Sequence, residues 1–218
     1  MDTMVDDIAV LAYNDDTGRN RVQHLAYALA GGVLAELVLQ QRIDIDSSGR
    51  VSVVSAVPTR DTVIDACLQR ISQDRPRKAK SWVKKLSRGL KNTVLDSLVE
   101  RRILTHQRGA FLGLIPLNRY HPADGTRKAE LRSRLESAIA AEAASDARTA
   151  VLAGTVWAAS MYKAALPGYS RFGVRKILKS INDGPFATDA TRQAVKAIRK
   201  AVSDANAAAA NAGGGGGG

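Results

Sequence analysis

Residues 24–41 constrain the fold more than any other part of the chain, because their apolar residues recur at helical spacing in two registers. Those registers are Leu25, Leu29, Val33 and Leu37, and Leu25, Ala28, Gly32, Ala35 and Leu39. The segment therefore predicts an apolar helix. Gly31 and Gly32 lower its helix propensity, so we expect them to allow close packing of a neighbouring helix.

The composition favours packed helices. Hydrophobic residues make up 45% of the 218 residues, enough to bury a real core, whereas aromatic residues make up only 5%. The core must therefore consist mainly of Leu, Val, Ile and Ala. The same periodicity predicts helices from residue 58 to about 71, over 81–102, 127–142, 146–166 and 170–181, and from 188 to about 206.

Three short β elements interrupt this pattern. Residues 8–13 read as a strand that ends in the turn 14–18, and residues 43–54 and 103–120 read as hairpins. We expect one mainly α domain over residues 1–206. An Ala- and Gly-rich tail over 207–218 is expected to be disordered.

Cellular context follows from features near the N-terminus and from cysteine usage. The single cysteine, Cys67, excludes an internal disulfide framework and fits a reducing compartment. It lies on the inward face of its predicted helix, so we expect it to pack as a small apolar residue. The first ten residues are acidic and lack a secretory signal pattern. No apolar run approaches the roughly 18 residues that span a bilayer, so we expect a cytoplasmic protein that can lie on a membrane.

Positive charge is concentrated in the middle of the chain. Residues 70–91 hold nine bases against the single acid Asp74, a net charge of +8 in a chain whose net charge is +11. Those bases are Arg70, Arg75, Arg77, Lys78, Lys80, Lys84, Lys85, Arg88 and Lys91. This concentration predicts an anionic partner, either a membrane or a nucleic acid.

The predicted helix 81–102 focuses part of this charge. Lys84, Arg88 and Lys91 are spaced by four and three residues and so share one helical face, with Lys85 one step around. Trp82, Leu86, Leu90, Val94 and Leu98 form the apolar stripe of the same helix. Near an anionic bilayer each base contributes roughly 1 kcal/mol, so five such bases give about 5 kcal/mol.

Further bases lie near the C-terminus, on the predicted helices 170–181 and 188–206. They are Arg171, Arg175, Lys179, Arg192, Lys196, Arg199 and Lys200. Whether they join the first basic region is a tertiary question that the sequence leaves open.

The second predicted hairpin has an apolar tip formed by Phe111, Leu112, Leu114 and Ile115. If exposed, these residues would insert into lipid or dock another subunit. The alternative is that alternate residues pack on the parent helices. Burying one or two of them in lipid would add roughly 1.5 to 3 kcal/mol each, and oligomerisation would make attachment firm through avidity.

Catalytic and metal-binding motifs are absent from the sequence. His24, His106 and His121 are far apart and show no metal-ligand spacing, and no nucleophile elbow, phosphate loop or dinucleotide fingerprint is present. The acid pairs at positions 6–7 and 15–16 lie at a terminus and a turn, so we expect solvated carboxylates. The sequence therefore predicts no enzyme, no metal site and no cofactor.

The order of these segments resembles the Golgi phosphoprotein 3 family, including its bacterial members. The resemblance covers nearly the whole chain to about residue 205. It rests on IAVLAYNDDTGR, LAYALAGGVLAELVLQQRIDID, PTRDTVIDACLQRI, SWVKKLSRGLKNTVLDSLVERRIL and RTAVLAGTVWAASMYKAAL. It implies a single, mainly α domain with a central helical bundle, peripheral helices and small β-hairpins.

The resemblance also implies a peripheral membrane protein. Eukaryotic members bind phosphatidylinositol 4-phosphate and hold the cytosolic tails of Golgi glycosyltransferases, and a hairpin, here about residues 107–118, contributes to self-association and membrane contact. The family's headgroup pocket uses a tryptophan and an arginine around the first long helix and two bases on a later one. The two bases correspond to Arg88 and Lys91. Arg21 and Ala30 stand at the other two positions, so the tryptophan and the first arginine are absent here.

The predicted lipid headgroup site therefore comprises Arg88, Lys91 and Arg21, with Lys84 and Lys85 from the basic helix. We expect an anionic membrane lipid, a phosphoinositide or another acidic phospholipid, as the partner of a homo-oligomer. One alternative is a nucleic-acid-binding module, because a basic helix followed by a hairpin resembles a winged helix, although its wing would have an apolar centre. The other is a protein-interaction scaffold that receives acidic partners.

Overall fold

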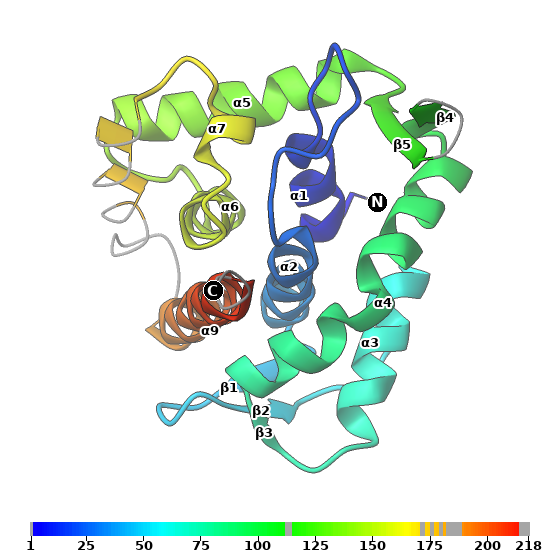
Figure 1. The fold of residues 1–218 in the computed structure, drawn as a ribbon. Helices are drawn as coiled ribbons and strands as arrows, with labels where there is room; N and C mark the ends of the chain where they lie inside the picture. The colour runs from blue at the N-terminus through cyan, green and yellow to red at the C-terminus, as the bar shows by residue number, and fades with distance from the viewer. Residues whose placement is uncertain are drawn as a thin grey trace.

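Helix α2 (Leu25–Leu39) lies at the centre of the fold, and every residue from Ala28 to Val38 is buried (Figure 1). The computed structural model describes residues 2–111, 115–170, 173–174, 177–178, 181 and 189–213. The helices that contact α2 are α1 (Met4–Ala12), α3 (Thr62–Ser72), α4 (Ala79–Glu100), α6 (Ala147–Ala158) and α9 (Asp189–Gly213). The predicted apolar helix is confirmed, and the fold is mainly α.

The two glycines of α2 mark the closest helix contacts. A Cβ atom at Gly31 would lie 2.4 Å from Val202 Cγ2 of α9, and one at Gly32 would lie 2.6 Å from Ile8 Cδ1 of α1. Real side chains do not tolerate such distances. The expected close packing is therefore confirmed, and it involves two different neighbouring helices.

The predicted strand over residues 8–13 is wrong, because these residues belong to helix α1 and its C-terminal end. Thr3 caps this helix: its hydroxyl accepts the Asp6 N–H at 3.2 Å, and the Asp6 carboxylate accepts the Thr3 N–H at 3.0 Å. A short apolar run fits a buried helix as well as a strand. The turn after it is confirmed, with the Gly18 N–H donating to the Asn14 carbonyl at 2.9 Å.

Both predicted hairpins are present. Strands β1 (Ile43–Ile45) and β2 (Arg50–Val53) pair antiparallel, and β3 (Arg77–Lys78), which the sequence patterns did not predict, adds a third strand. Strands β4 (Leu104–Phe111) and β5 (Ile115–Pro122) form a separate two-stranded ladder with Phe111 opposite Ile115. Leu112 and Leu114, at the predicted tip, lie outside the described residues.

The C-terminal half departs from the expected boundaries. Helix α5 (Gly125–Ala140) is as predicted, whereas the expected helix 146–166 is divided into α6 and α7 (Tyr162–Ala165). The division occurs at Ser160, whose φ of 55° is incompatible with a continuing right-handed helix. The expected helix 170–181 lies largely outside the described residues. Helix α9 runs to Gly213, so residues 207–213 are helical rather than disordered, in keeping with the high helix propensity of alanine.

The acids at positions 6 and 7 are buried rather than solvated as expected. Asp6 pairs with Arg101, and the Asp7 carboxylate lies 2.8 Å from Arg127 and 3.0 Å from Arg148. Asp15 is partly exposed and pairs with Lys128 at 2.6 Å and Arg132 at 2.8 Å. The acidic N-terminal region is thus neutralised by basic side chains from α5, from α6 and from Arg101 at the C-cap of α4.

Cys67 packs in the core, as predicted, with 3% of its surface exposed. Burial raises the pKa of its thiol from 9.0 to about 11. Because the thiolate is the reactive form, we expect the native protein to react with an aromatic disulfide reagent at least about a hundredfold more slowly than the urea-unfolded chain. Absorbance of the released thiolate measures both rates, and equal rates would show that Cys67 is accessible.

Candidate lipid-headgroup site

Helix α4 bends at Arg88 and Gly89. Arg88 has φ −70° and ψ 112°, and Gly89 has φ 80° and ψ −19°, so neither continues the right-handed helix. Glycine adopts a positive φ at no steric cost. The prediction that Lys84, Arg88 and Lys91 share one face of a regular helix is therefore wrong, because helical spacing does not continue across the bend.

Three of the five predicted headgroup residues surround this bend. Lys84 and Arg88 are exposed, and Lys91 is half-buried. Within the described residues, no carboxylate lies within ion-pair distance of these three side chains. We call Lys84, Arg88 and Lys91 the α4 bend site. Its charge is available to an external anion.

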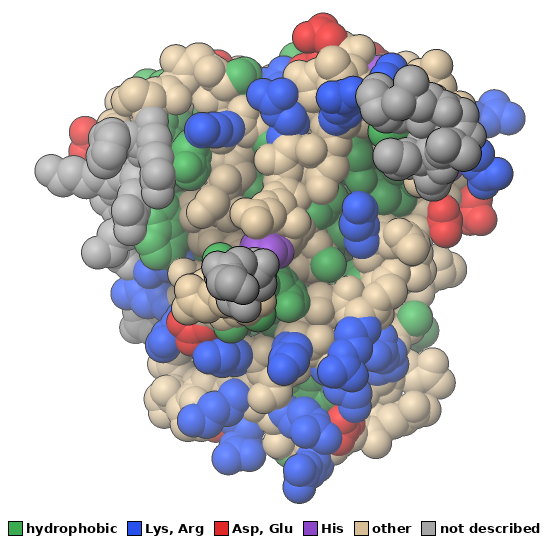
Figure 2. Space-filling view, viewed as in Figure 1, with side chains coloured by type: hydrophobic (Ala, Val, Ile, Leu, Met, Phe, Trp, Pro, Cys, Tyr) green, Lys and Arg blue, Asp and Glu red, His purple; other side chains and the backbone are tan. Residues whose placement is uncertain are grey.

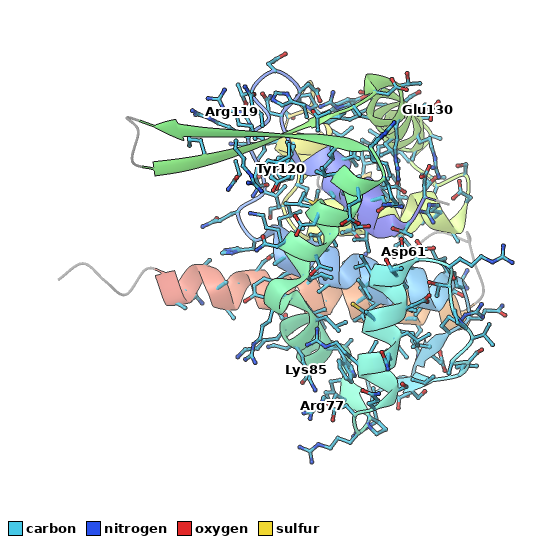
Figure 3. All side chains as sticks on the ribbon, turned by 90° about the vertical axis from the view of Figure 1, so that its right-hand side faces the viewer. Asp61, Arg77, Lys85, Arg119, Tyr120 and Glu130 are labelled. Atoms are coloured by element: carbon cyan, nitrogen blue, oxygen red, sulfur yellow. The ribbon has the colours of Figure 1, made fainter. Side chains whose placement is uncertain are left out.

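Lys85 faces a different environment. Its ammonium group donates to the Asp74 carboxylate and lies 5.3 Å from the centroid of the Trp82 ring. Arg77 binds the same carboxylate through Nε at 2.9 Å and Nη2 at 3.0 Å, and Figure 3 shows Arg77 and Lys85 close together. The hydrogen bonds from Arg77 and Lys85 hold the pKa of Asp74 well below its usual range. Lys85 thus already has an internal anion, and the structure separates it from the α4 bend site.

Arg21 and Ala30 occupy different environments on either side of the α2 N-terminus. Arg21 is exposed in the loop before α2, and its backbone N–H donates to the Ala12 carbonyl at 2.8 Å. In the described part of the chain, no hydrogen bond or ion pair joins Arg21 to α4. Ala30 is 0% exposed inside the core. Position 30 therefore contributes no group to a surface site.

The β4–β5 hairpin is anchored at its base and projects to one side of the molecule (Figure 3). Tyr120 stacks on His106 with centroids 4.5 Å apart and meets the edge of Tyr13 at 5.2 Å, while its N–H donates to the Gly18 carbonyl at 2.9 Å. The C-terminal end of α9 projects from the same side of the molecule (Figures 1 and 3). The exposed apolar tip stays a prediction, because the side chains of residues 110–116 lie outside those described.

Two features were missed by sequence reasoning. Asp74 was counted only as one opposing charge, although it binds both Arg77 and Lys85. The bend had a visible signal in Gly89, since glycine within a helical pattern marks a weak point. Local spacing did not mark Lys85 as a partner of Asp74, because Lys85 lies in the following helix.

Fold and site together define a class of protein: a mainly α domain with a projecting hairpin and a basic α4 bend site that has no carboxylate partner among the described residues. Figure 2 shows Lys and Arg side chains gathered over the lower part of the face from which the hairpin projects. Across the described residues, no helix is long and apolar enough to cross a bilayer. Within the same residues, no group of three His, Cys, Asp or Glu side chains is placed to hold a metal ion.

The chain belongs to the Golgi phosphoprotein 3 (GPP34) family, whose model matches residues 4–198. The match spans α1 to the middle of α9 and therefore includes the α4 bend site and the hairpin. Among curated proteins there is no significant match.

Proposed function

We propose that this protein is a peripheral membrane protein that binds anionic lipid headgroups at the α4 bend site, with Arg21 as an additional contact. The observation that carries the proposal is the absence of a carboxylate partner for Lys84, Arg88 and Lys91 within the described residues. Membership of the Golgi phosphoprotein 3 family supports a phosphoinositide-type headgroup. We propose a binding role without catalysis and without a cofactor.

The environment of position 30 favours general anionic binding over strict recognition of phosphatidylinositol 4-phosphate. Ala30 is buried and supplies no cation, and Arg21 supplies no aromatic ring for the lipid interface. Lys84, Arg88 and Lys91 attract phosphate groups by their positive charge, and this attraction does not depend on the other groups of a lipid headgroup. The preference between lipids is therefore expected to follow charge more than headgroup stereochemistry.

The strength of this attachment is modest for one copy. The three bases of the α4 bend site contribute about 3 kcal/mol near an anionic bilayer. This is less than the value for five bases, because Lys85 is paired with Asp74 and Arg21 lies outside the α4 bend site. We infer that self-association through the β4–β5 hairpin supplements this binding by avidity. Hairpin residues entering the lipid would add roughly 1.5 to 3 kcal/mol each.

The test removes the positive charges of Arg88 and Lys91, which lie on either side of Gly89 in the sequence. The Arg88→Gln/Lys91→Gln variant is expected to bind anionic vesicles about thirtyfold more weakly, because each base contributes roughly 1 kcal/mol. Co-sedimentation is measured with vesicles of phosphatidylcholine alone, with added phosphatidylglycerol, and with added phosphatidylinositol 4-phosphate at equal total charge. Binding to both anionic mixtures should weaken as salt rises.

The control is Arg60→Gln/Lys163→Gln, which removes the same charge at two exposed positions outside α4. It should sediment as the parent protein does, and circular dichroism should show that both variants are folded. If the Arg88/Lys91 variant sediments unchanged, the site assignment is wrong. If the parent protein does not bind any of the vesicles but binds DNA with sequence preference at raised salt, the nucleic-acid alternative replaces the proposal.

A further inference from the structure

A pocket of about 530 Å³ lies between the β1–β2 turn, the start of α4 and helix α9. Four lysines line it: Lys78 and Lys80 from the first basic region, and Lys196 and Lys200 from α9. These pairs are more than a hundred residues apart in sequence. Figure 2 shows Lys and Arg side chains gathered over this part of the surface. None of the residues of the α4 bend site lines the pocket.

Two acids also line the pocket, and both are engaged within the protein. The Asp46 carboxylate accepts hydrogen bonds from the Ser48 N–H at 2.9 Å, the Ser48 hydroxyl at 2.7 Å and the Arg50 N–H at 2.8 Å. These bonds, led by the one from the Ser48 hydroxyl, lower the pKa of Asp46. Asp46 therefore belongs to the β1–β2 turn, where it holds the backbone in place.

Asp204 pairs with two lysines of the pocket. It lies 3.1 Å from Lys200 and 3.7 Å from Lys80. The side chains of Lys200 and Lys80 remain 77% and 61% exposed, so they can reorient toward an entering anion. Among the described lining residues, lysines outnumber acids by four to two.

The N-terminus of α4 adds a fixed positive potential to the pocket wall. Ala79 and Lys80 form the first turn of this helix and line the pocket. Lys78 at the N-cap position provides no side-chain cap, and the Ala79 N–H donates to the Gly49 carbonyl at 2.8 Å. The other N–H groups of the first turn have no intrahelical acceptor. The helix dipole is positive at this end. Lysine charge and helix dipole therefore favour the same kind of ligand.

We propose that this pocket binds a compact ligand carrying two or more phosphate groups, independently of the α4 bend site. A ligand with several negative charges can displace Asp204 from two lysines at once, whereas a single weak anion competes poorly with a carboxylate already in place. Lysine ammonium groups bind phosphate as mobile point charges. The ligand is either the headgroup of a phosphorylated lipid or a soluble phosphorylated molecule of the same chemistry.

Titration calorimetry of the full chain with inorganic pyrophosphate tests the pocket. The Lys80→Ala/Lys200→Ala variant should bind about thirtyfold more weakly, because two charge contacts are lost and Asp204 remains. Asp204→Asn should bind about fivefold more tightly, because a competing carboxylate is removed. The charge-matched control Arg60→Ala/Lys163→Ala should bind as the parent does. Opposite changes in the two pocket variants cannot arise from general unfolding.

Absence of saturable pyrophosphate binding, or equal affinity of the parent and both pocket variants, overturns the proposal. The Arg88→Gln/Lys91→Gln variant should retain pyrophosphate binding. A failure of the proposed lipid site at the α4 bend can therefore be distinguished from a failure of the proposed pocket site. Vesicles of phosphatidylcholine with phosphatidylinositol 4-phosphate distinguish the ligand sources. Weaker sedimentation of Lys80→Ala/Lys200→Ala than of its charge-matched control identifies a lipid headgroup, and equal sedimentation identifies a soluble ligand.

Discussion

Replacing Arg148 with methionine is expected to lower the free energy of unfolding by about 3 kcal/mol. The Arg148 guanidinium joins three helices, because it lies on α6 and binds carboxylates from two others. Its Nη1 is 3.1 Å from Glu36 Oε2 on α2, and its Nη2 is 3.0 Å from Asp7 Oδ2 on α1. Removing the guanidinium breaks the charge network that joins these three helices.

The size of the effect comes from the carboxylates that remain. The side chains of Glu36 and Asp7 are each only 5% exposed, whereas Arg148 is 28% exposed. Burial by itself would lower the pKa of Arg148, but the two carboxylates outweigh it and raise that pKa. Asp7 keeps Arg127 as a partner at 2.8 Å. Among the described residues Glu36 would keep only neutral donors, the Met4 N–H and the Gln40 amide, so its buried charge would lack a counter-ion there.

Urea unfolding monitored by circular dichroism measures the change. Adding Glu36→Gln to Arg148→Met should recover part of the lost stability, because the uncompensated carboxylate is then removed. The control Arg75→Met changes an exposed arginine before β3 and should stay within about 0.5 kcal/mol of the parent. If Arg148→Met proves as stable as Arg75→Met, the network contributes nothing to folding.

Gly18→Ala is expected to lower the free energy of unfolding by a similar amount, about 3 kcal/mol. Gly18 has a φ of +60°, which costs an alanine roughly 1 to 2 kcal/mol. The new Cβ would also lie 2.5 Å from His121 Nε2 and 2.9 Å from Arg119 Cβ on β5. Overpacking of this kind costs typically about 1 to 3 kcal/mol. The turn would be pushed away from the base of the hairpin.

Gly49→Ala is the matched control for Gly18→Ala. Gly49 has a φ of +77° in the β1–β2 turn, but a Cβ there would meet nothing within 4 Å. It should therefore cost only the conformational part, about 1 to 2 kcal/mol. Urea unfolding gives both values, and near-ultraviolet circular dichroism follows the Tyr13–Tyr120 contact at the hairpin base. Equal losses in the two variants would show that the turn does not pack tightly on β5.

Local sequence patterns predicted the elements whose packing is repetitive. The apolar stripe of α4 is buried at all five expected positions: Trp82, Leu86, Leu90, Val94 and Leu98. Cys67 on α3 is buried as predicted, and both predicted hairpins are present. Periodicity is sufficient there because burial of one helix face or one strand ladder is decided within a few residues. It failed for α1, where all residues are buried and no periodicity distinguishes a helix from a strand.

The candidate headgroup site was only partly predictable, because spacing along the chain does not show how side chains are arranged in space. Helical spacing grouped Lys84, Arg88 and Lys91, but the bend at Gly89 decides their actual arrangement. Counting charges treated Lys85 as equivalent to its neighbours, whereas Asp74 neutralises it. Short-range spacing does not show which base meets an internal carboxylate.

Composition and periodicity over a few turns were enough to show that the chain is mainly α, that its middle is strongly basic and that α2 is an apolar helix able to pack closely. Which charges are used internally and which remain on the surface depends on the tertiary structure. It buried Asp6 and Asp7 beside distant arginines, and it placed Lys78 and Lys80 around one pocket with Lys196 and Lys200. Electrostatic interaction depends on distance in space, and chain folding alone brings residues a hundred positions apart within a few ångströms.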